Sequence, residues 1–376
     1  MSPKSPISKP AVLFISHDAS LTGAPLCLGE LLNSLSRTEL GFEPIVFLRG
    51  EGPLLQEWRA AGLHIHVFPK RKWTGIVGKV INRLLSIFEY IRFFLRVRPR
   101  LIYSSTILNN AEIIIGRLLG ARTLVHVHEG KRFIGRHIAM MYISSWFTTR
   151  YICVSQYSAL ALRKTIGAEG KVVHNGIDAN AMQSPMGRLP ESKVVLGMVG
   201  GIQPNKGHHI AIEAIAKLPP EIRNAARLCI FGKVEDEKYR RSLDTLIERL
   251  NIGDQIEFRG VVSSRDRIYA TIDVLILASF EESFGRVILE AFAYSRPVIA
   301  SAVGGVPEII TNGENGLLVQ PGNAVELAAA LLLVLQDQEL VMRITRNAFA
   351  DMKKRFRLDD SVARLRSEIE SMLTQD

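Results

Sequence analysis

Short apolar runs alternate along this chain with longer segments of helical spacing, and this alternation limits the possible folds more than any other feature. The run AVLFIS is followed by leucines at 28, 31, 32 and 35, the spacing of one helix face, and then by the run PIVFL. Continuous runs rich in β-branched residues are typical of strands covered on both faces. The sequence therefore predicts an α/β protein with parallel sheets and helices on both sides of each sheet. Further runs of this kind are HIHVF, LIYSS, TLVHVH, YICVS, VVLGMVG, RLCIFG, QIEFRG, DVLILAS and PVIAS.

The alternation pauses once, at HNGIDANAMQSPMGRLPES, whose content of Gly, Pro, Asn and Ser is typical of a linker. A chain of 376 residues is long enough for two domains, since one domain usually takes roughly 100–200 residues. We expect a first Rossmann-like domain at 1–180, joined by a C-terminal helix at 357–376, and a second Rossmann-like domain at 181–356. Ligands of doubly wound sheets bind outside the carboxyl ends of the strands, so the two domains are predicted to face a central cleft.

The formal net charge of +10 is unevenly distributed. Residues 1–178 hold 23 Lys and Arg against 11 Asp and Glu, so the rest of the chain is slightly acidic. A basic half favours an anionic partner such as acidic lipid or nucleic acid, with a solvated basic face as the alternative. Because no recognisable nucleic-acid motif accompanies the charge, no nucleic-acid partner is expected.

Cysteine usage and the absence of targeting signals indicate the compartment. Cys27, Cys153 and Cys229 lie far apart in apolar surroundings, which favours buried core residues in a reducing compartment over a structural metal site. The N-terminal MSPKSPISKP lacks the apolar segment of a signal peptide, and no stretch approaches the roughly 18 apolar residues of a spanning helix. We expect a cytoplasmic protein whose membrane contact, if it has one, is peripheral.

The segment from 70 to 100 combines an apolar helical stripe with many basic residues and has Trp73 near its start. A basic amphipathic helix of this kind fits the interface of an anionic membrane. The alternative is a helix packed on the sheet with a charged outer face. The stripe consists of Val77, Val80, Ile81, Leu84, Phe88, Ile91 and Leu95, and the basic residues are Lys79, Arg83, Arg92, Arg96, Arg98 and Arg100.

The stretch EESFGRVILEAF sets Glu282 and Glu290 eight residues apart, after the predicted strand DVLILAS. With a helix predicted from Phe284 to Ser295, Glu282 lies in the preceding loop and Glu290 about two turns into the helix. Eight residues leave about 80° to the nearest full turn, so the spacing does not imply two carboxylates acting on one water. An ionised carboxylate can instead accept hydrogen bonds from two hydroxyl groups of a diol, with a surface or capping role as the alternative.

The surroundings of these glutamates resemble the donor-binding signature of the GT-B glycosyltransferases of the large retaining group called family 4, or group 1. The matching residues are Glu282-Ser-Phe-Gly285, Glu290, PVIA from Pro297, GGVPE from Gly304 to Glu308 and NGLL from Asn315. The resemblance runs through the whole chain in order, with SHDASLTGAP, HVHE, CVSQYS, HNGID and GMVGGIQPNKG before the signature.

The resemblance implies a role for each matching residue. Glu290 would accept from the ribose hydroxyls of a nucleotide, and Glu282 would hold hydroxyls of the transferred sugar. The amides of Ser283, Phe284 and Gly285, at the start of a helix, would meet sugar or phosphate oxygens, which the helix dipole favours. The domain at 181–356 would thus bind the nucleotide-sugar, and the domain at 1–180 would bind the acceptor.

GMVGGIQPNKG resembles the first strand, loop and helix of the family's donor domain. Lys206 would there place its charge on the diphosphate, and Gly207 would open the helix. The family pattern commonly has an arginine where this chain has Gly201. Arg286 could replace that arginine or could turn to solvent, and the sequence leaves both open.

Several residues of the first domain are candidates at the carboxyl ends of its strands. Gly23 and the amide of Ala24 correspond to the family's glycine loop, where a glycine lets the backbone approach a diphosphate. His126 and His128 point to one side of a strand, and the resemblance assigns the sugar or acceptor to His128 rather than to His126. Residues that border the family's cleft, or act only in turns and caps, are Ser155, Asn175 and Gly176.

The resemblance implies a hexosyl transfer from a UDP- or GDP-sugar to a glycan or lipid-linked acceptor, with retention and without a metal ion or other cofactor. Lys206 and backbone amides would stabilise the departing diphosphate, and nothing resembles a DxD metal motif. A hinge near 175–192 would close the domains on the donor. Two alternatives remain open: a nucleotide-sugar epimerase of the same fold, and a nucleotide-sugar-binding protein without turnover.

Overall fold

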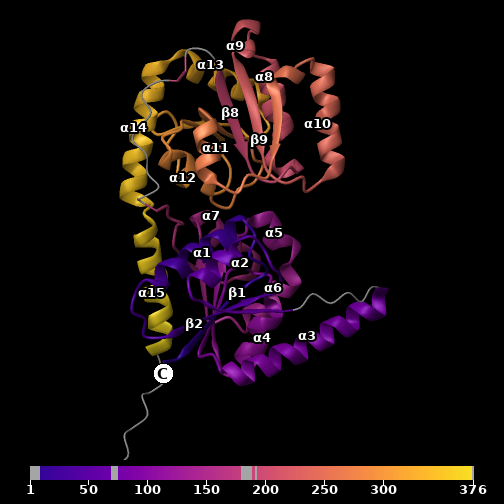
Figure 1. Ribbon diagram of the computed structural model, residues 1–376, viewed down its shortest axis with the longest axis vertical. Coiled ribbons are helices and arrows are strands. Elements are labelled where there is room, and N and C mark those ends of the chain that lie inside the picture. The colour runs from indigo at the N-terminus through magenta and orange to yellow at the C-terminus, as the bar shows by residue number, and fades with distance from the viewer. Residues whose placement is uncertain (1–8, 69–74, 179–188, 191–192, 375–376) are drawn as a thin grey trace, which may run out of the picture. The chain divides into compact units, whose positions relative to one another are not determined.

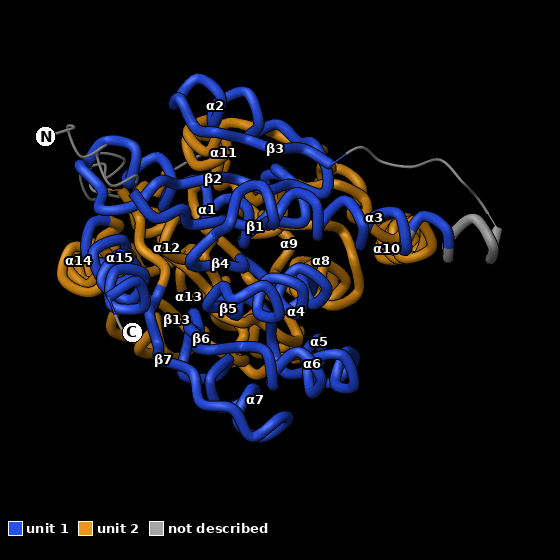
Figure 2. The backbone as a smooth tube through the Cα atoms, turned by 90° about the horizontal axis from the view of Figure 1, so that it is seen from below, with its two compact units in different colours: residues 1–174, 359–376 blue, residues 175–358 orange. Residues whose placement is uncertain are grey.

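The structure is a computed structural model that describes residues 9–68, 75–178, 189–190 and 193–374, with the backbone alone at 75–80 and 83. The chain forms two compact units, Met1–His174 with Asp359–Asp376, and Asn175–Leu358 (Figure 2). The division falls at 174–175 and 358–359, beside the sequence-based boundaries at 180–181 and 356–357. Most of the predicted linker and the N-terminal leader lie outside the described residues.

Unit 1, the part with both chain ends, contains a seven-stranded parallel sheet in the order β3-β2-β1-β4-β5-β6-β7. All strand pairs of this sheet are parallel, which confirms the predicted α/β fold. Strand order reverses between β1 and β4, so their carboxyl ends border the place where doubly wound sheets bind ligands. The strands are β1 (Ala11–Ser16), β2 (Glu43–Leu48), β3 (His64–Val67), β4 (Leu101–Ser104), β5 (Arg122–Val127), β6 (Arg150–Cys153) and β7 (Gly170–Val172).

The helices of unit 1 connect these strands and cover both faces of the sheet (Figure 1). Their apolar sides pack on strand residues that are almost fully buried, such as Leu13, Ile15 and Ile102. The helices are α1 (Gly23–Ser36), α2 (Leu54–Ala60), α3 (Gly75–Val97), α4 (Asn110–Leu118), α5 (Lys131–Arg136), α6 (Ile138–Ser145), α7 (Gln156–Ile166) and α15 (Leu358–Thr374).

Helix α3 has two apolar faces. Leu84, Phe88 and Leu95, from the predicted stripe, are exposed by 62%, 64% and 54%. At 100° per residue these three side chains lie within about 40° of one another, and the side chains packed on the sheet lie roughly opposite. The helix therefore packs on the sheet, and its outer side carries the apolar stripe together with the exposed Arg92 and Arg96. The residues packed on the sheet are Tyr90, Phe93 and Phe94.

Helix α15 packs on unit 1, as predicted for the C-terminal helix. Glu368 accepts hydrogen bonds from Arg150 of β6, at 2.6 Å, and from Lys171 of β7. Arg122 of β5 donates to the carbonyl of Met372 near the end of the helix. These contacts attach a segment from the far end of the sequence to the edge of the first sheet (Figure 1).

Unit 2 contains a six-stranded parallel sheet in the order β10-β9-β8-β11-β12-β13. Strand order reverses between β8 and β11, which are hydrogen-bonded neighbours although their paired residues Leu196 and Val274 are 78 positions apart. Its core is built from strand residues such as Leu196, Leu228 and Ile276. The strands are β8 (Val194–Val199), β9 (Ala226–Phe231), β10 (Ile256–Gly260), β11 (Val274–Leu277), β12 (Val298–Ser301) and β13 (Leu317–Val319).

Helices again cover both faces of the second sheet (Figure 1). Among the described residues of this unit, three short 3₁₀ turns lie in the loops. The α-helices are α8 (His208–Ala216), α9 (Pro220–Asn224), α10 (Glu237–Leu250), α11 (Arg265–Thr271), α12 (Arg286–Ala293), α13 (Ala324–Gln336) and α14 (Gln338–Arg355), and the turns are η2 (Pro204–Lys206), η3 (Gly253–Gln255) and η4 (Val306–Glu308).

The cysteines are free thiols, with Cys153 and Cys229 buried as expected and Cys27 only half-buried. In the part of the chain that the structure describes, no helix combines the length and the apolar character that crossing a bilayer requires.

Candidate functional site

The loops after β8 and β11 of unit 2 lie side by side at the point where the strand order reverses. They are tied together by backbone and side-chain hydrogen bonds: the amide of Phe280 donates to the carbonyl of Asn205 at 2.9 Å, and the side chain of Asn205 donates to the carbonyl of Glu281 at 3.1 Å. The carboxyl ends of β8 and β11 therefore carry one continuous polar surface, where a doubly wound sheet binds its ligand.

Lys206 and Gly207 form the turn between β8 and α8. Gly207 has φ +66°, and a Cβ there would lie 2.0 Å from the carbonyl oxygen of Ala278. Only glycine fits such a left-handed position so close to another backbone. Gly207 opens α8 directly, as predicted, and this tight turn holds Lys206 at the end of the preceding 3₁₀ turn.

Glu282 lies in the loop between β11 and α12, as predicted, and pairs with Lys206. The distance from Nζ of Lys206 to Oε2 of Glu282 is 2.8 Å, with the side chains 25% and 17% exposed. The backbone of Glu282 is fixed from the other side, because the amide of Gly305 donates to its carbonyl at 3.0 Å and Gly304, at φ +56°, leaves no room for a Cβ there. The structure thus brings together two predicted site residues that are 76 positions apart.

Glu290 is 6% exposed and its carboxylate is held by three groups. Arg286 donates from Nε at 3.1 Å, Tyr269 donates its hydroxyl at 3.0 Å, and Nε of Arg265 lies 3.5 Å away. Burial, and then the Glu290 carboxylate, raise the pKa of Tyr269 well above its ordinary value, so the phenol stays protonated and donates. Glu290 is therefore a fixed acceptor near the start of α12.

The start of α12 differs from the sequence-based prediction. The helix begins at Arg286 rather than Phe284, because Gly285 adopts φ +96° and ends the loop there. Glu290 consequently lies just over one turn into the helix, and the predicted two turns are wrong. The side chain of Phe284 is 2% exposed and packs near Phe356, with ring centroids 6.1 Å apart, so only its backbone faces the loop that contains Ser283.

At Gly201, where the family pattern commonly has an arginine, the nearest group is the carboxylate of Glu235. A Cβ at Gly201 would lie 2.4 Å from Oε1 of Glu235, whose side chain is exposed and able to move. Arg286 does not turn to solvent, which excludes one of its two sequence-based alternatives, since it is 9% exposed and pairs with Glu290. Its role toward a diphosphate stays a prediction.

In unit 1, His126 and His128 lie on the same side of the end of β5, with ring centroids 4.2 Å apart. His126 is 2% exposed, its Nδ1 lies 2.5 Å from the hydroxyl of Tyr103, and burial lowers its pKa to about 3. His126 is thus a neutral core histidine. His128, the residue assigned to ligand by the resemblance, is the more exposed of the two.

Glu129, next to His128, is a candidate that the sequence analysis missed. Its carboxylate accepts from the hydroxyl of Thr106, from the amide of Ile107 at 3.2 Å and from the amide of His128 at 3.0 Å. Burial raises the pKa of Glu129 to about 6, against the lowering effect of these hydrogen bonds. The group joins the ends of β4 and β5 and can hold a proton near neutral pH.

The remaining predicted residues of this region take simple positions. Gly23 is exposed at the first position of α1, with open space where a Cβ would stand and Ala24 beside it. Ser155 caps α7 by accepting from the amide of Ser158 at 3.0 Å, which was one of its two predicted roles. Asn175 and Gly176 lie at the start of unit 2, where Gly176 passes close to the backbone of Arg357.

Two residues that hold Glu290, Arg265 and Tyr269, were also missed. Both come from α11, where Arg265 is 25 and Tyr269 is 21 positions before Glu290. The only sequence signal was a short amphipathic helix before DVLILAS, which does not indicate which of its side chains reach α12.

The comparisons with known proteins place both units in described families. A family model described as Glycosyl transferases group 1 matches residues 183–351, and one described as Glycosyltransferase Family 4 matches residues 22–181. Among curated proteins, the chain is 32% identical to the D-inositol 3-phosphate glycosyltransferase of Mycobacterium marinum, over 46% of this chain and 38% of that protein. It is 29% identical to the N-acetyl-alpha-D-glucosaminyl L-malate synthase of Bacillus anthracis, over 50% of this chain and 48% of that protein. The matches thus span less than half the length of these relatives.

Among solved structures, Anabaena HepE in complex with UDP-glucose superposes with a TM-score of 0.82 at 23% identity, over 96% of this chain and 99% of that one. At this identity the likeness shows the fold. The two family matches together follow the chain from residue 22 to 351, one on each sheet. The chain therefore belongs to the group 1 glycosyltransferases of the GT-B fold.

Proposed function

We propose that this protein is a hexosyltransferase that moves a sugar from a nucleoside diphosphate, UDP or GDP, to a glycan or lipid-linked acceptor, with retention and without a metal ion. The observation that carries the proposal is the pairing of Lys206 with Glu282 at 2.8 Å where the strand order of unit 2 reverses. A cation, a carboxylate and a helix start then meet where the fold binds ligands.

The ion pair gives the donor site a way to respond to its ligand. A diphosphate is a stronger partner for Lys206 than a single carboxylate, so the nucleotide draws the ammonium away from Glu282. The freed carboxylate of Glu282 then accepts from sugar hydroxyls, and amides at Ser283 to Gly285 meet the neighbouring oxygens. Because Lys206 supplies positive charge at the leaving diphosphate, the site has its own means of stabilising the departing group.

Glu290 is proposed to bind the ribose. Its two oxygens are already oriented by Arg286 and Tyr269, and a fixed carboxylate accepts from adjacent hydroxyls with little loss of conformational freedom. In unit 1, His128 and the glycine turn at Gly23 and Ala24 are proposed to serve the acceptor and the diphosphate. The departing phosphate would take the proton of the acceptor.

The names of the relatives suggest the chemistry to test first. One is named for D-inositol 3-phosphate and another for a glucosaminyl L-malate, so acidic polar acceptors belong in the assay beside lipid-linked ones. A UDP-sugar is the first donor to test, since HepE was solved with UDP-glucose. We further propose a cytoplasmic enzyme that meets a membrane peripherally through residues 70–100.

Calorimetry with UDP-, GDP- and ADP-sugars tests the donor site. Glu290→Gln keeps the size and one acceptor of the side chain, and Glu257→Gln is the matched control, because Glu257 pairs with Arg259 at 2.9 Å in the same unit but on β10. Loss of one charged hydrogen bond weakens binding by about 10-fold to 100-fold. One nucleotide should bind the wild type and the control alike and bind Glu290→Gln more weakly. Equal binding by all three proteins would remove Glu290 from the site.

Product analysis separates transfer from the two alternatives. Nucleotide release that requires an acceptor supports transfer, and formation of an epimer of the donor sugar without acceptor supports an epimerase. Binding without either product supports a protein that binds nucleotide-sugar without turnover.

A further inference from the structure

The exposed large hydrophobic side chains of the described residues are concentrated on one side of unit 1. Eleven of the sixteen lie on α3, at the end of α4 or on α6, while the rest are scattered. We call this surface the apolar face. A soluble protein rarely leaves so many apolar side chains together without a partner. Its most prominent members are 50–77% exposed, and they are Leu84, Phe88, Leu95, Leu118, Ile143 and Trp146.

The apolar face is continuous across the three helices. Helix α4 packs against α3 on one side and against α6 on the other, and Figure 2 shows it between them. All three helices belong to connections that carry the chain in the same direction across the sheet, from β3 through β4 to β6. Because such connections are right-handed, the helices cover the same side of the sheet.

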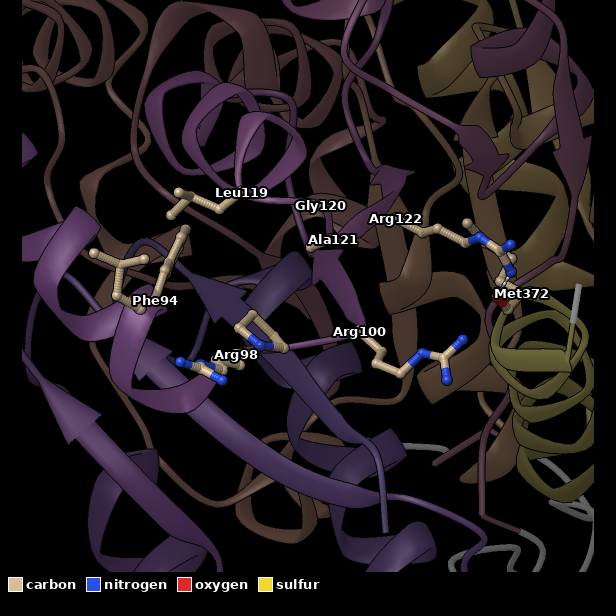
Figure 3. A pocket seen from close by; sticks show the side chains of 11 residues that line it. Phe94, Arg98, Arg100, Leu119, Gly120, Ala121, Arg122 and Met372 are labelled. Atoms are coloured by element: carbon tan, nitrogen blue, oxygen red, sulfur yellow. Dashed lines mark hydrogen bonds between the residues drawn. The ribbon is translucent and has the colours of Figure 1, made fainter. Parts of the chain in front are cut away.

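A groove of about 530 Å³ borders the apolar face at the amino ends of β4 and β5. Phe94, Leu95 and Leu119 form its apolar wall, and Arg98, Arg100 and Arg122 add three guanidinium groups (Figure 3). Arg100 and Arg122 extend toward Met372, whereas Arg98 extends to the other side, below Phe94 (Figure 3). The groove therefore presents cations on both sides of an apolar wall.

Two of these arginines are available to a ligand. Arg122 already donates to the carbonyl of Met372. Arg98 and Arg100 are exposed, and no carboxylate of the described residues pairs with either side chain. A guanidinium group binds phosphate oxygens in a two-pronged geometry, which suits Arg98 and Arg100 to a phosphate diester at the edge of an apolar phase.

The charge around the apolar face selects its partner. The exposed Arg92 and Arg96 flank the apolar stripe of α3, and the only carboxylates on α3, α4 and α6 are the half-buried Glu89 and the buried Glu112. An apolar surface bordered by cations, with an exposed tryptophan, complements the headgroup region of an anionic bilayer. A protein partner would need a surface that is both apolar and strongly acidic.

We propose that the apolar face and the groove dock this protein on anionic phospholipid, with acyl chains against Phe88 and Leu95 and headgroup phosphates on Arg98 and Arg100. This inference deepens the membrane contact of the proposed function and moves its centre from the predicted helix alone to three helices and a phosphate groove. It does not depend on sugar transfer.

Co-sedimentation with vesicles of phosphatidylcholine, with and without phosphatidylglycerol, tests the proposal on the full chain. The variants are Arg98→Glu with Arg100→Glu, and Phe88→Ser with Leu95→Ser; all four side chains are exposed, and circular dichroism checks that the folds are kept. The matched control is Arg343→Glu with Arg346→Glu, two exposed arginines on α14. The wild type and the control should bind the phosphatidylglycerol vesicles, and each variant should bind at least about tenfold more weakly.

Four results would overturn the proposal. In the vesicle assay, these are a wild type that shows no preference for the anionic vesicles, and an arginine variant that binds them as well as its control does. The other two are saturation of the groove by soluble glycerol phosphate at the same concentration as lipid, and a dimer in solution that the Phe88 and Leu95 changes dissociate. Binding of the UDP-sugar to each variant, measured by calorimetry, is read separately. A failed donor site and a failed membrane surface therefore give different patterns.

Discussion

Glu290 should stabilise unit 2 even without ligand, which makes Glu290→Leu the most informative single change. The substitution leaves Arg286 buried, 9% exposed, without its partner at 3.1 Å. Breaking a buried ion pair from one side costs about 3–5 kcal/mol, and we take about 3 kcal/mol because Arg265 and Tyr269 are part of the same cluster. For a unit of this size each kcal/mol shifts Tm by roughly 2–4 °C, so Tm should fall by about 6–12 °C.

The chain offers an internal reference for this measurement. Its three tryptophans, Trp58, Trp73 and Trp146, all belong to the first unit. Tryptophan fluorescence therefore follows unit 1, while far-UV circular dichroism follows both units. The Glu290→Leu change should move part of the circular dichroism transition and leave the fluorescence transition in place.

A double variant decides whether the buried charge is the cause. Arg286→Met combined with Glu290→Leu removes both charges, and well-packed apolar replacements of a buried pair are often neutral or stabilising. The double variant should regain most of the lost Tm, and Glu257→Leu, on a half-exposed carboxylate, should lose much less. The reasoning is refuted if the double variant is no more stable than Glu290→Leu, or if Glu257→Leu is equally damaging.

Three further changes test other parts of the structure. Burial raises the pKa of Glu129 from 4.5 to about 6, so the folded state binds the proton more tightly than the unfolded state, and the free energy of unfolding falls as the pH rises from 4.5 to about 6. This fall is worth about 2 kcal/mol, and thermal melts across the same pH range should show a flatter dependence for Glu129→Gln. Gly304→Ala should lower the free energy of unfolding by more than the about 1–2 kcal/mol of a left-handed φ, because its Cβ meets the carbonyl of Glu282. Gly313→Ala, also at positive φ but with open space, should cost only about 1–2 kcal/mol, and equal losses in urea titrations would contradict the close packing. Glu368→Gln should raise hydrogen exchange in α15, since Arg150 and Lys171 lose their shared carboxylate, and unchanged exchange would show that apolar packing alone holds the helix.

The sequence could predict those parts of the fold that depend on local pattern. Apolar runs predicted the strands of both sheets except the three-residue edge strands β7 and β13, because a buried parallel strand needs a continuous apolar run whatever its neighbours are. The same reasoning placed Glu282 in a loop, and the family resemblance placed Gly207 at a helix start. It misplaced the start of α12 by two residues, because the left-handed conformation of Gly285 depends on how its loop packs.

The sequence could not predict contacts that tertiary packing alone creates. Arg265 and Tyr269 reach Glu290 only because α11 lies beside α12. Likewise, helical spacing identified the stripe with Phe88 on α3, but spacing cannot say which of two apolar faces meets the sheet. The helix uses its aromatic side, with Phe93 and Phe94, and so leaves the stripe exposed.

In unit 1, different side chains lie at the amino ends and at the carboxyl ends of the parallel strands, and the apolar face connects the two ends. The groove with Arg98 and Arg100 lies at the amino ends of the strands, while His128 and Glu129 follow the carboxyl end of β5. Helix α5 starts two residues after Glu129 and leads directly into α6, which belongs to the apolar face. A bilayer against this face would therefore extend from the phosphate groove toward the candidate acceptor residues. A lipid-linked acceptor could then approach His128 along α6 without leaving the membrane surface, whereas a soluble acceptor would gain nothing from the docking. Adding anionic vesicles should therefore raise the rate of sugar transfer only with a lipid-linked acceptor.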